Sequence, residues 1–229
     1  MNSISVNLTT IRQRIASTCA RVGKDPSRVQ LVAVSKTKPA ALVMDALEAG
    51  QIIFGENRIQ EARDKVPTVN DARAQWHLIG PLQRNKVKYA VKLFHMIHSV
   101  DSIALAEALN KRYTQADPLS VLIQVNIGGE TQKHGVAPDQ AQSLIRAMAD
   151  MKNLAVKGLM TVPPYHPDQE QIRPYFRDLA QLAEDLKRLE LPSVSMDELS
   201  MGMSHDFETA VEEGATLVRV GSAIFGNRG

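Results

Sequence analysis

The chain has 229 residues, with 27 lysines and arginines against 25 aspartates and glutamates, and its formal net charge is only +2. The two signs are interleaved, so we expect no nucleic-acid surface, and the hydrophobic content of 44% is too high for a disordered chain. Cys19 is the only cysteine, which excludes an internal disulfide and favours a reducing compartment. The N-terminal residues lack a basic segment followed by an apolar stretch, so we expect no signal peptide, and no apolar run approaches the ~20 residues of a membrane helix. We therefore expect a soluble, cytoplasmic protein.

Short apolar runs alternate with longer stretches of helical periodicity from residue 29 to the end of the chain. The apolar runs, which we predict to be strands, are Leu31–Ser35, Ile52–Phe54, Trp76–Ile79, Met96–Ser99, Ser120–Asn126, Ala155–Met160, Ser195–Ser200 and Thr216–Val220. The predicted helices are Leu8–Arg21, Ala40–Ala49, Arg58–Lys65, Asn85–Phe94, Ile103–Arg112, Asp139–Met151, Gln169–Leu189 and Phe207–Glu213.

Residues typical of helix ends agree with these boundaries. Pro39 opens the first helix after a strand, where its missing N–H costs little. Gly50 and Gly214 follow helical stretches, where a left-handed residue is favoured. Asp101 and Asp206 occupy predicted N-cap positions.

Regular alternation of strands and helices with short connections predicts parallel strands joined by right-handed crossovers. Eight such units form an α/β fold, a single (β/α)8 TIM barrel, with an extra N-terminal helix. A barrel of this kind typically takes roughly 250 residues, so we expect one domain over residues 1–229. An open, doubly wound sheet is the alternative.

Lys36 is the candidate nucleophile. In a TIM barrel the active site lies at the carboxyl ends of the strands, and Lys36 directly follows the first predicted strand. A lysine at the end of a buried strand loses hydration, which favours the neutral amine that forms an imine. The alternatives are an ordinary surface lysine and Lys38, which stands before Pro39 where exposure is expected.

Two loops rich in serine and glycine follow the seventh and eighth predicted strands. Barrel enzymes often bind phosphate with the loops after these two strands. Glycine lets backbone N–H groups approach an anion, and each serine hydroxyl can also donate. Such sequences also form simple turns. The candidate residues in the two loops are Ser200, Met201, Gly202, Gly221 and Ser222.

Arg219 stands between two valines near the end of the last predicted strand. It shares one side of that strand with Gly221, so if Gly221 meets a ligand, Arg219 points into the barrel mouth. A guanidinium keeps its proton. Opposite a pyridine nitrogen it would disfavour protonation of that nitrogen and weaken the ring as an electron sink. The alternative is an arginine paired with a carboxylate.

No metal site is predicted. His95 and His98 have the i, i+3 spacing of metal ligands, but no further ligand accompanies them in the sequence.

Several motifs, in order along the chain, together resemble one known family. They are Ala33-Val34-Ser35-Lys36-Thr37-Lys38-Pro39, Phe54-Gly55-Glu56-Asn57, Trp76-His77-Leu78-Ile79-Gly80-Pro81-Leu82-Gln83, Gly158-Leu159-Met160, Leu199-Ser200-Met201-Gly202-Met203-Ser204 and Arg219-Val220-Gly221-Ser222-Ala223-Ile224-Phe225-Gly226. The chain resembles the pyridoxal 5′-phosphate (PLP) homeostasis proteins, the YggS/PROSC family, from about residue 5 to the end.

The resemblance implies a barrel similar to the N-terminal domain of alanine racemase, with PLP held as a Schiff base on Lys36. It also implies roles for further cofactor-binding residues. Ser200, Gly221 and Ser222 would hold the phosphate and Arg219 would face the ring nitrogen, and the residues that would line the pocket are Asn57, His77 and Met160.

The resemblance further implies a protein that buffers and delivers PLP, with effects on amino-acid and keto-acid metabolism, and no established catalytic reaction. Its partners would be PLP and PLP-dependent apo-enzymes, with no nucleic acid and no membrane, and we expect a monomer.

A PLP-dependent racemase is the first alternative to a non-catalytic carrier. A racemase needs a second acid or base opposite the lysine, which alanine racemase takes from an extra β domain of its partner subunit. We expect this domain to be absent, and of the four tyrosines we expect only Tyr165 to reach the mouth. A sugar-phosphate aldolase with Lys36 as its imine-forming lysine is the other alternative, but it does not account for Arg219.

Overall fold

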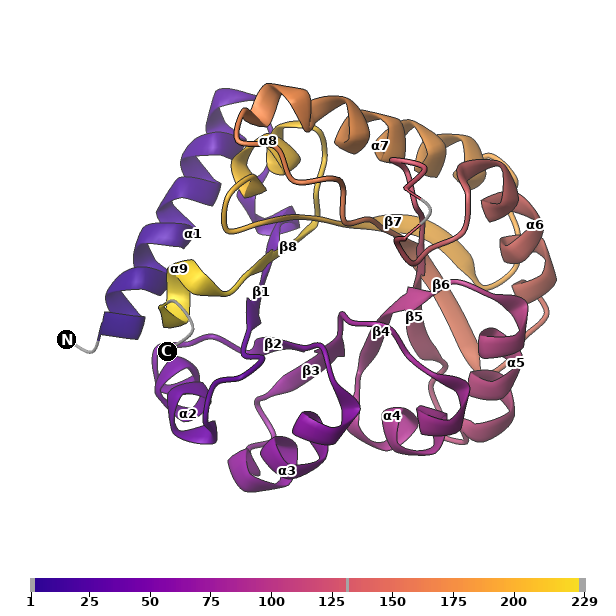
Figure 1. The fold of residues 1–229 in the computed structure, drawn as a ribbon, viewed down its shortest axis with the longest axis horizontal. Coiled ribbons are helices and arrows are strands. Elements are labelled where there is room, and N and C mark those ends of the chain that lie inside the picture. Colours follow the sequence, from indigo (N-terminus) through magenta and orange to yellow (C-terminus); the bar gives the residue numbers. More distant parts are fainter. Residues whose placement is uncertain (1–2, 131, 227–229) are drawn as a thin grey trace.

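The computed structural model describes residues 3–130 and 132–226, and their eight parallel strands close into a barrel in the order β1 to β8 (Figure 1). The strands are β1 (Gln30–Val34), β2 (Ile53–Glu56), β3 (Gln75–Leu78), β4 (Met96–Val100), β5 (Leu119–Gln124), β6 (Leu154–Met160), β7 (Val194–Met203) and β8 (Leu217–Val220). The TIM barrel is confirmed, and the open-sheet alternative is wrong because β1 pairs with β8.

The α-helices lie outside the barrel. They are α1 (Ser3–Arg21), α2 (Ala40–Glu48), α3 (Ile59–Val69), α4 (Val87–Leu93), α5 (Ile103–Arg112), α6 (Pro138–Met148), α7 (Arg173–Lys187), α8 (Phe207–Glu212) and α9 (Ser222–Phe225). The N-terminal helix α1 packs against α2, α8 and α9 through an apolar stripe of helical spacing that includes Leu8, Ile11 and Ile15 (Figure 1). Among the described residues, no helix is long and apolar enough to cross a membrane.

Most predicted boundaries are confirmed, and the exceptions have local causes. Gly50 and Gly214 have positive φ angles after α2 and α8, as expected. The assignment of Asp101 as an N-cap is wrong, because Ser102 holds that position before α5. Asp206 is the N-cap of α8, but its Oδ1 accepts a hydrogen bond from Met203 N at 2.6 Å rather than from the helix.

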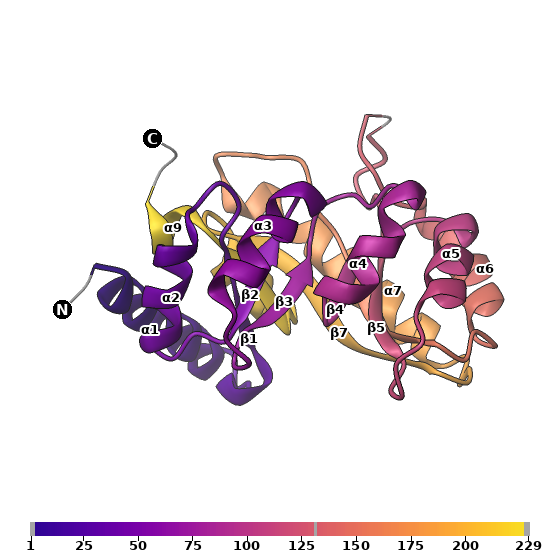
Figure 2. The same cartoon turned by 90° about the horizontal axis from the view of Figure 1, so that it is seen from below.

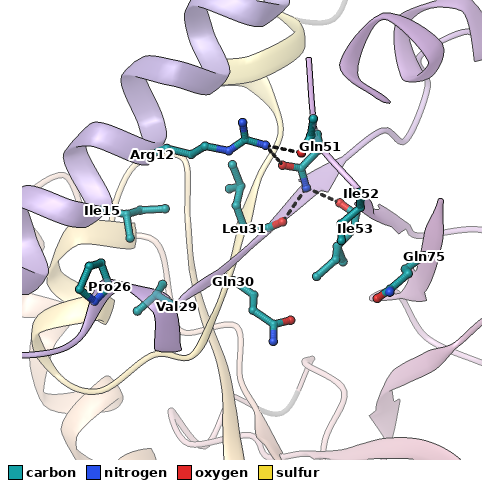
Figure 3. Close-up of a pocket in the computed structure, with 11 residues that line it drawn as sticks. Arg12, Ile15, Pro26, Val29, Gln30, Leu31, Gln51, Ile52, Ile53 and Gln75 are labelled. Atoms are coloured by element: carbon teal, nitrogen blue, oxygen red, sulfur yellow. Dashed lines mark hydrogen bonds between the residues drawn. The ribbon is translucent and has the colours of Figure 1, made fainter. Parts of the chain in front are cut away.

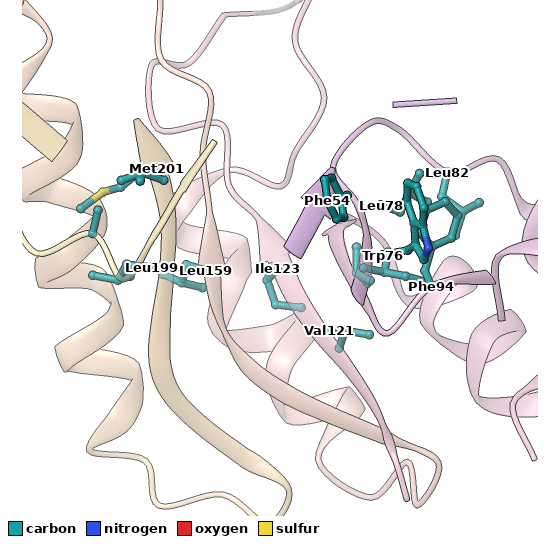
Figure 4. Close-up of a cluster of buried hydrophobic side chains, with 14 of the residues drawn as sticks. Phe54, Trp76, Leu78, Leu82, Phe94, Val121, Ile123, Leu159, Leu199 and Met201 are labelled. Carbon is teal, nitrogen blue, oxygen red and sulfur yellow. The ribbon is translucent and has the colours of Figure 1, made fainter. Parts of the chain in front are cut away.

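Two apolar layers hold the barrel together. Between strands and helices lies the larger layer, which includes Phe54, Trp76 and Ile123 (Figure 4). Inside the barrel a smaller cluster fills the space between the strands, and it consists of Val32, Ile53, Leu122, Met160 and Leu217. The barrel interior is therefore a packed core, and a ligand has to bind at one of its two ends.

A pocket of about 470 Å³ lies at the end of the barrel where β1, β2 and β3 begin (Figure 3). Two of its polar side chains, Arg12 and Gln51, bind one another and the backbone. Arg12 donates to Gly50 O at 2.9 Å and to Gln51 Oε1 at 3.2 Å, and Gln51 Nε2 donates to the carbonyls of Leu31 and Ile53. These hydrogen bonds tie α1 and the end of α2 to the strands, which is a structural role.

Candidate functional site

A second pocket of about 470 Å³, called the mouth pocket below, lies at the carboxyl ends of the strands. Five of the predicted site residues line it, namely Lys36, Asn57, Arg219, Gly221 and Ser222. The other residues that line it are Val34, Thr37, Lys38, Ile79, Val162, Met203, Ser204, His205 and Gly226. Residues from β1, β2 and β8 thus meet at this end of the barrel.

Strand register explains this convergence. Val34 of β1 pairs with Gly55 of β2, and Ala33 pairs with Val220 of β8. The next residues beyond these pairs are therefore neighbours, and a Cβ on Gly221 would lie 3.2 Å from Val34 Cβ. Only a residue without a side chain fits comfortably there, so the backbone after β8 comes directly alongside the strand that carries Lys36.

Lys36 lies in a tight turn after β1. Ser35 O accepts a hydrogen bond from Lys38 N at 3.0 Å, and Thr37 has φ +62°. A positive φ at the third residue is the pattern of a type II turn, in which glycine is usual and a β-branched residue is strained. Lys36 and Lys38 are both half-buried and both line the mouth pocket, so burial does not separate these two candidates.

Asn57 follows β2 and offers an unused acceptor. Its Oδ1 is buried, and within residues 3–130 and 132–226 it has no hydrogen-bond partner. A buried polar atom without a partner is costly. A ligand that donates a hydrogen bond at this point of the mouth pocket would relieve that cost.

Arg219 enters the mouth pocket from β8 and is only 4% exposed. Its Nη1 donates to Ser200 Oγ at 2.5 Å and its Nη2 donates to Thr161 O at 2.8 Å. Among the described residues it forms no ion pair with a carboxylate, so the alternative of a simple carboxylate partner is not observed. Burial lowers the pKa of Arg219 to about 10 against the opposing effect of Asp206, so the guanidinium is still charged at neutral pH.

A buried chain of hydrogen bonds continues from Arg219 into the barrel. Ser200 Oγ lies 2.9 Å from His98 Nδ1, and His98 Nε2 lies 3.0 Å from His77 Nδ1. Burial, with a smaller effect from His95, lowers the pKa of His77 to about 3. Burial also lowers the pKa of His98, with smaller effects from His77 and Arg219. Both rings are therefore neutral at neutral pH and can relay hydrogen bonds without adding charge.

Because these two histidines are buried and neutral, we predict that the folded protein loses stability in mild acid. The unfolded chain takes up a proton on His77 below pH 6.5, whereas the folded protein takes it up only near pH 3. The contribution of His77 to the free energy of unfolding is therefore fully present above the pKa of the unfolded chain. It is lost as the pH falls, by about 2 kcal/mol between pH 7 and pH 5. Urea unfolding at these two pH values should show a smaller fall for His77→Gln than for the wild type. An equal fall in both proteins would contradict the assignment.

The remaining predicted residues do not line the mouth pocket. Met160 belongs to the inner cluster and Met201 to the outer layer. Gly202 has φ +87°, and a Cβ there would lie 2.5 Å from Ala210 Cβ, so it packs against α8. Ser200 is fully buried between His98 and Arg219, which does not favour its direct contact with a phosphate. Ligand contacts of these residues and of His77 stay predictions.

The predicted loop after the seventh strand is wrong in its bounds, because β7 runs on through Ser200, Met201 and Gly202 to Met203. Ser204, which directly follows β7, was not among the predicted site residues. It lines the mouth pocket, and its Oγ accepts a hydrogen bond from Gly221 N at 3.2 Å. This hydrogen bond joins the two predicted phosphate loops. The repeated serine in Ser200-Met201-Gly202-Met203-Ser204 was the signal available in the sequence.

Comparison with known proteins assigns this chain to a family. The model of the alanine racemase N-terminal domain matches residues 6–229. A pyridoxal phosphate homeostasis protein of Aquifex aeolicus is 42% identical over 222 residues, which covers 96% of each chain. The chain belongs to the pyridoxal phosphate homeostasis protein family.

Solved structures agree with membership of this family. PipY of Synechococcus elongatus PCC7942, solved with PLP bound, has a TM-score of 0.81 and 37% identity over 93% of this chain and 100% of that one. Alanine racemase of Corynebacterium glutamicum has a TM-score of 0.73 at 16% identity, covering 99% of this chain and 62% of the racemase chain. At that identity the racemase supports the fold alone.

Proposed function

We propose that this protein holds PLP in the mouth pocket as a Schiff base on Lys36 and acts as a non-catalytic carrier in PLP homeostasis. It would buffer PLP in the cytoplasm and deliver it to apo-enzymes, and so influence amino-acid and keto-acid metabolism. The observation that carries the proposal is the meeting of Lys36, Arg219 and Ser222 on one pocket. The PLP-bound structure of PipY, a relative of 37% identity, supports it.

The residues of the mouth pocket fit PLP group by group. Asn57 Oδ1 is a buried acceptor without a partner among the described residues, suited to a donor on the cofactor ring. Ser204 directly follows β7 and Ser222 begins α9, and both line the mouth pocket, where their hydroxyls could donate to a phosphate. The charged Arg219 would face the pyridine nitrogen, and Ser200 with Thr161 O would hold its guanidinium in place.

The proposed link is an imine between protein and cofactor. The neutral Nζ of Lys36 would attack the aldehyde carbon of PLP, and the aldehyde oxygen would leave as water while a C=N bond forms. Bound PLP supplies an electron sink when its ring nitrogen is protonated. An Arg219 that is charged at neutral pH and lies opposite that nitrogen would disfavour this protonation, which suits storage of the cofactor better than chemistry on an amino acid.

The phosphate assignment makes a specific prediction. Ser204→Ala or Ser222→Ala removes one charge-assisted hydrogen bond, which costs about 1.5–3 kcal/mol, roughly one to two orders of magnitude in PLP affinity. Unphosphorylated pyridoxal should bind these variants almost as well as it binds the wild type. Ser200→Ala should instead weaken both ligands, because it loosens Arg219. Equal losses of PLP and pyridoxal in the Ser204 and Ser222 variants would show that neither serine contacts the phosphate.

Delivery can be tested directly by mixing the PLP-loaded protein with a PLP-dependent apo-enzyme and following the recovery of its activity. A carrier should restore activity when free PLP is scavenged by an excess of a competing amine. Recovery only without the scavenger would mean that PLP reaches the apo-enzyme through solution, which would contradict direct delivery.

A further inference from the structure

Lys65, on α3, is a buried lysine outside the mouth pocket. Its side chain is only 5% exposed, and its Nζ donates to Ser35 O at 2.6 Å, Glu56 Oε1 at 2.6 Å and Glu61 Oε1 at 2.7 Å. An ammonium has three donors and no acceptor. All three donors are therefore used, on acceptors from three different segments of the chain.

The same acceptors also hold the turn that carries Lys36. Ser35 Oγ donates to Glu56 Oε1 at 2.7 Å, and Thr37 N donates to Glu61 Oε1. Ser35 O accepts from Lys38 N as well as from Lys65. Lys65, Glu56 and Glu61, called the Lys65 cluster below, thus fix the residues on both sides of Lys36 while making no part of the pocket lining.

This turn needs support from outside. Thr37 has φ +62°, a conformation that glycine adopts readily and a β-branched residue does not. A strained turn persists only where its surroundings hold it, and such turns occur at functional sites. Val32 and Val34 lie on the side of β1 that faces the barrel interior. Lys36 follows at the same alternate spacing, so a turn fixed in this way keeps Lys36 on the inward-facing side.

Stability alone is a weak explanation for the Lys65 cluster. Taking ions out of water is costly, and buried ion pairs often add no net stability compared with apolar residues of the same size. Burial raises the pKa of the Glu56 carboxyl, against the opposing effects of Lys65 and Ser35, and Glu56 Oε2 has no partner in the described part of the chain. The cluster is thus imperfect as a core element, whereas each of its three residues also forms a hydrogen bond with Ser35 or Thr37 of the turn.

We propose that Lys65 is a positioning residue that, with Glu56 and Glu61, holds the strained Ser35–Lys38 turn so that Lys36 projects into the mouth pocket ready to form the Schiff base. This inference rests on the proposed Schiff base on Lys36. Lys65 acts only through the turn, so its effect should be confined to the step that uses Lys36.

The test is Lys65→Met, compared in the wild-type background and in Lys36→Ala. Schiff base is measured by its visible absorbance after mixing with PLP and by the fraction trapped with borohydride. We expect Lys65→Met to slow Schiff base formation and raise the apparent Kd for PLP, each about tenfold. In the Lys36→Ala background it should change residual PLP binding less than about twofold.

Two further variants separate positioning from loss of folding. Thr37→Gly relieves the strain at φ +62°, so adding it to Lys65→Met should restore most of the lost Schiff base formation. Leu109→Ala, a fully buried core change near the end of α5 away from the mouth, controls for general destabilisation. It should lower thermal stability without slowing Schiff base formation.

Each of these measurements can support or contradict the proposed role of Lys65. The inference would be overturned if Lys65→Met weakened PLP binding equally in the wild-type and Lys36→Ala backgrounds. It would also be overturned if Thr37→Gly restored nothing, or if Lys65→Met formed the Schiff base at the wild-type rate. If Lys36→Ala itself still forms the trapped Schiff base, the proposed function fails instead. Should Lys65→Met not fold, Glu61→Ala replaces it, since it removes the acceptor of Thr37 N and is expected to slow formation about threefold.

Discussion

Lys36→Ala is expected to lose the Schiff base completely and to weaken PLP binding about a hundredfold, equivalent to about 3 kcal/mol. The covalent link disappears, while Asn57, Arg219 and the two phosphate loops are left in place. The variant should therefore keep weak, reversible, non-covalent PLP binding, measurable by equilibrium dialysis.

Lys38→Ala is the matched control, because Lys38 also lines the mouth pocket and is equally half-buried. Its Schiff base should form at close to the wild-type level. If the two effects were exchanged, so that Lys38→Ala lost the visible absorbance and Lys36→Ala kept it, the assignment of the linking lysine would be wrong.

PLP-loaded protein is expected to exchange the Cα proton of L-alanine in deuterated water no faster than free PLP does. Racemisation needs a second acid or base opposite the lysine, and no tyrosine is among the described residues that line the mouth pocket. Tyr165 is 77% exposed, and its ring lies 5.3 Å from that of His205. A positioned acid or base typically contributes roughly 10²–10⁴-fold, so without a tyrosine in that position we expect only slow background chemistry unless His205 supplies the proton.

The measurement follows deuterium incorporation by mass spectrometry and stereoinversion by chiral chromatography. Inversion at ordinary enzyme rates, of order 1 s⁻¹ or faster, that is abolished by Lys36→Ala would establish a racemase instead of a carrier. His205, which lines the mouth pocket, would then be the first residue to replace as a source of the second proton.

Much of the fold could be predicted because the alternation of apolar runs and helical stretches is regular. The parts that were missed depend on tertiary contacts. The helix predicted to end at Lys65 runs on to Val69 with Pro67 inside it, and its last residue, Val69, is buried. The four-residue helix α9 is too short to show a period, and it is held by α1, whose Asn7 donates to Ile224 O at 2.9 Å.

The candidate site was predictable where polar residues directly follow strands, as at Lys36, Asn57 and Ser222. It was not predictable where function depends on strand register. His98 joins Ser200 across 102 residues of sequence, and only the closed barrel brings them within 2.9 Å. The contact of Lys65 with Ser35 O has the same origin, since an isolated lysine on a helix looks like an ordinary surface residue.

The most direct test of the Schiff base on Lys36 is to reduce the PLP-loaded wild-type protein with borohydride, digest it and locate the pyridoxyl group by mass spectrometry. We predict that the group lies on the peptide containing Lys36, on Lys36 itself, at close to one per chain. A pyridoxyl group found mainly on Lys38 or on another lysine, or no stable adduct at all, would contradict the account.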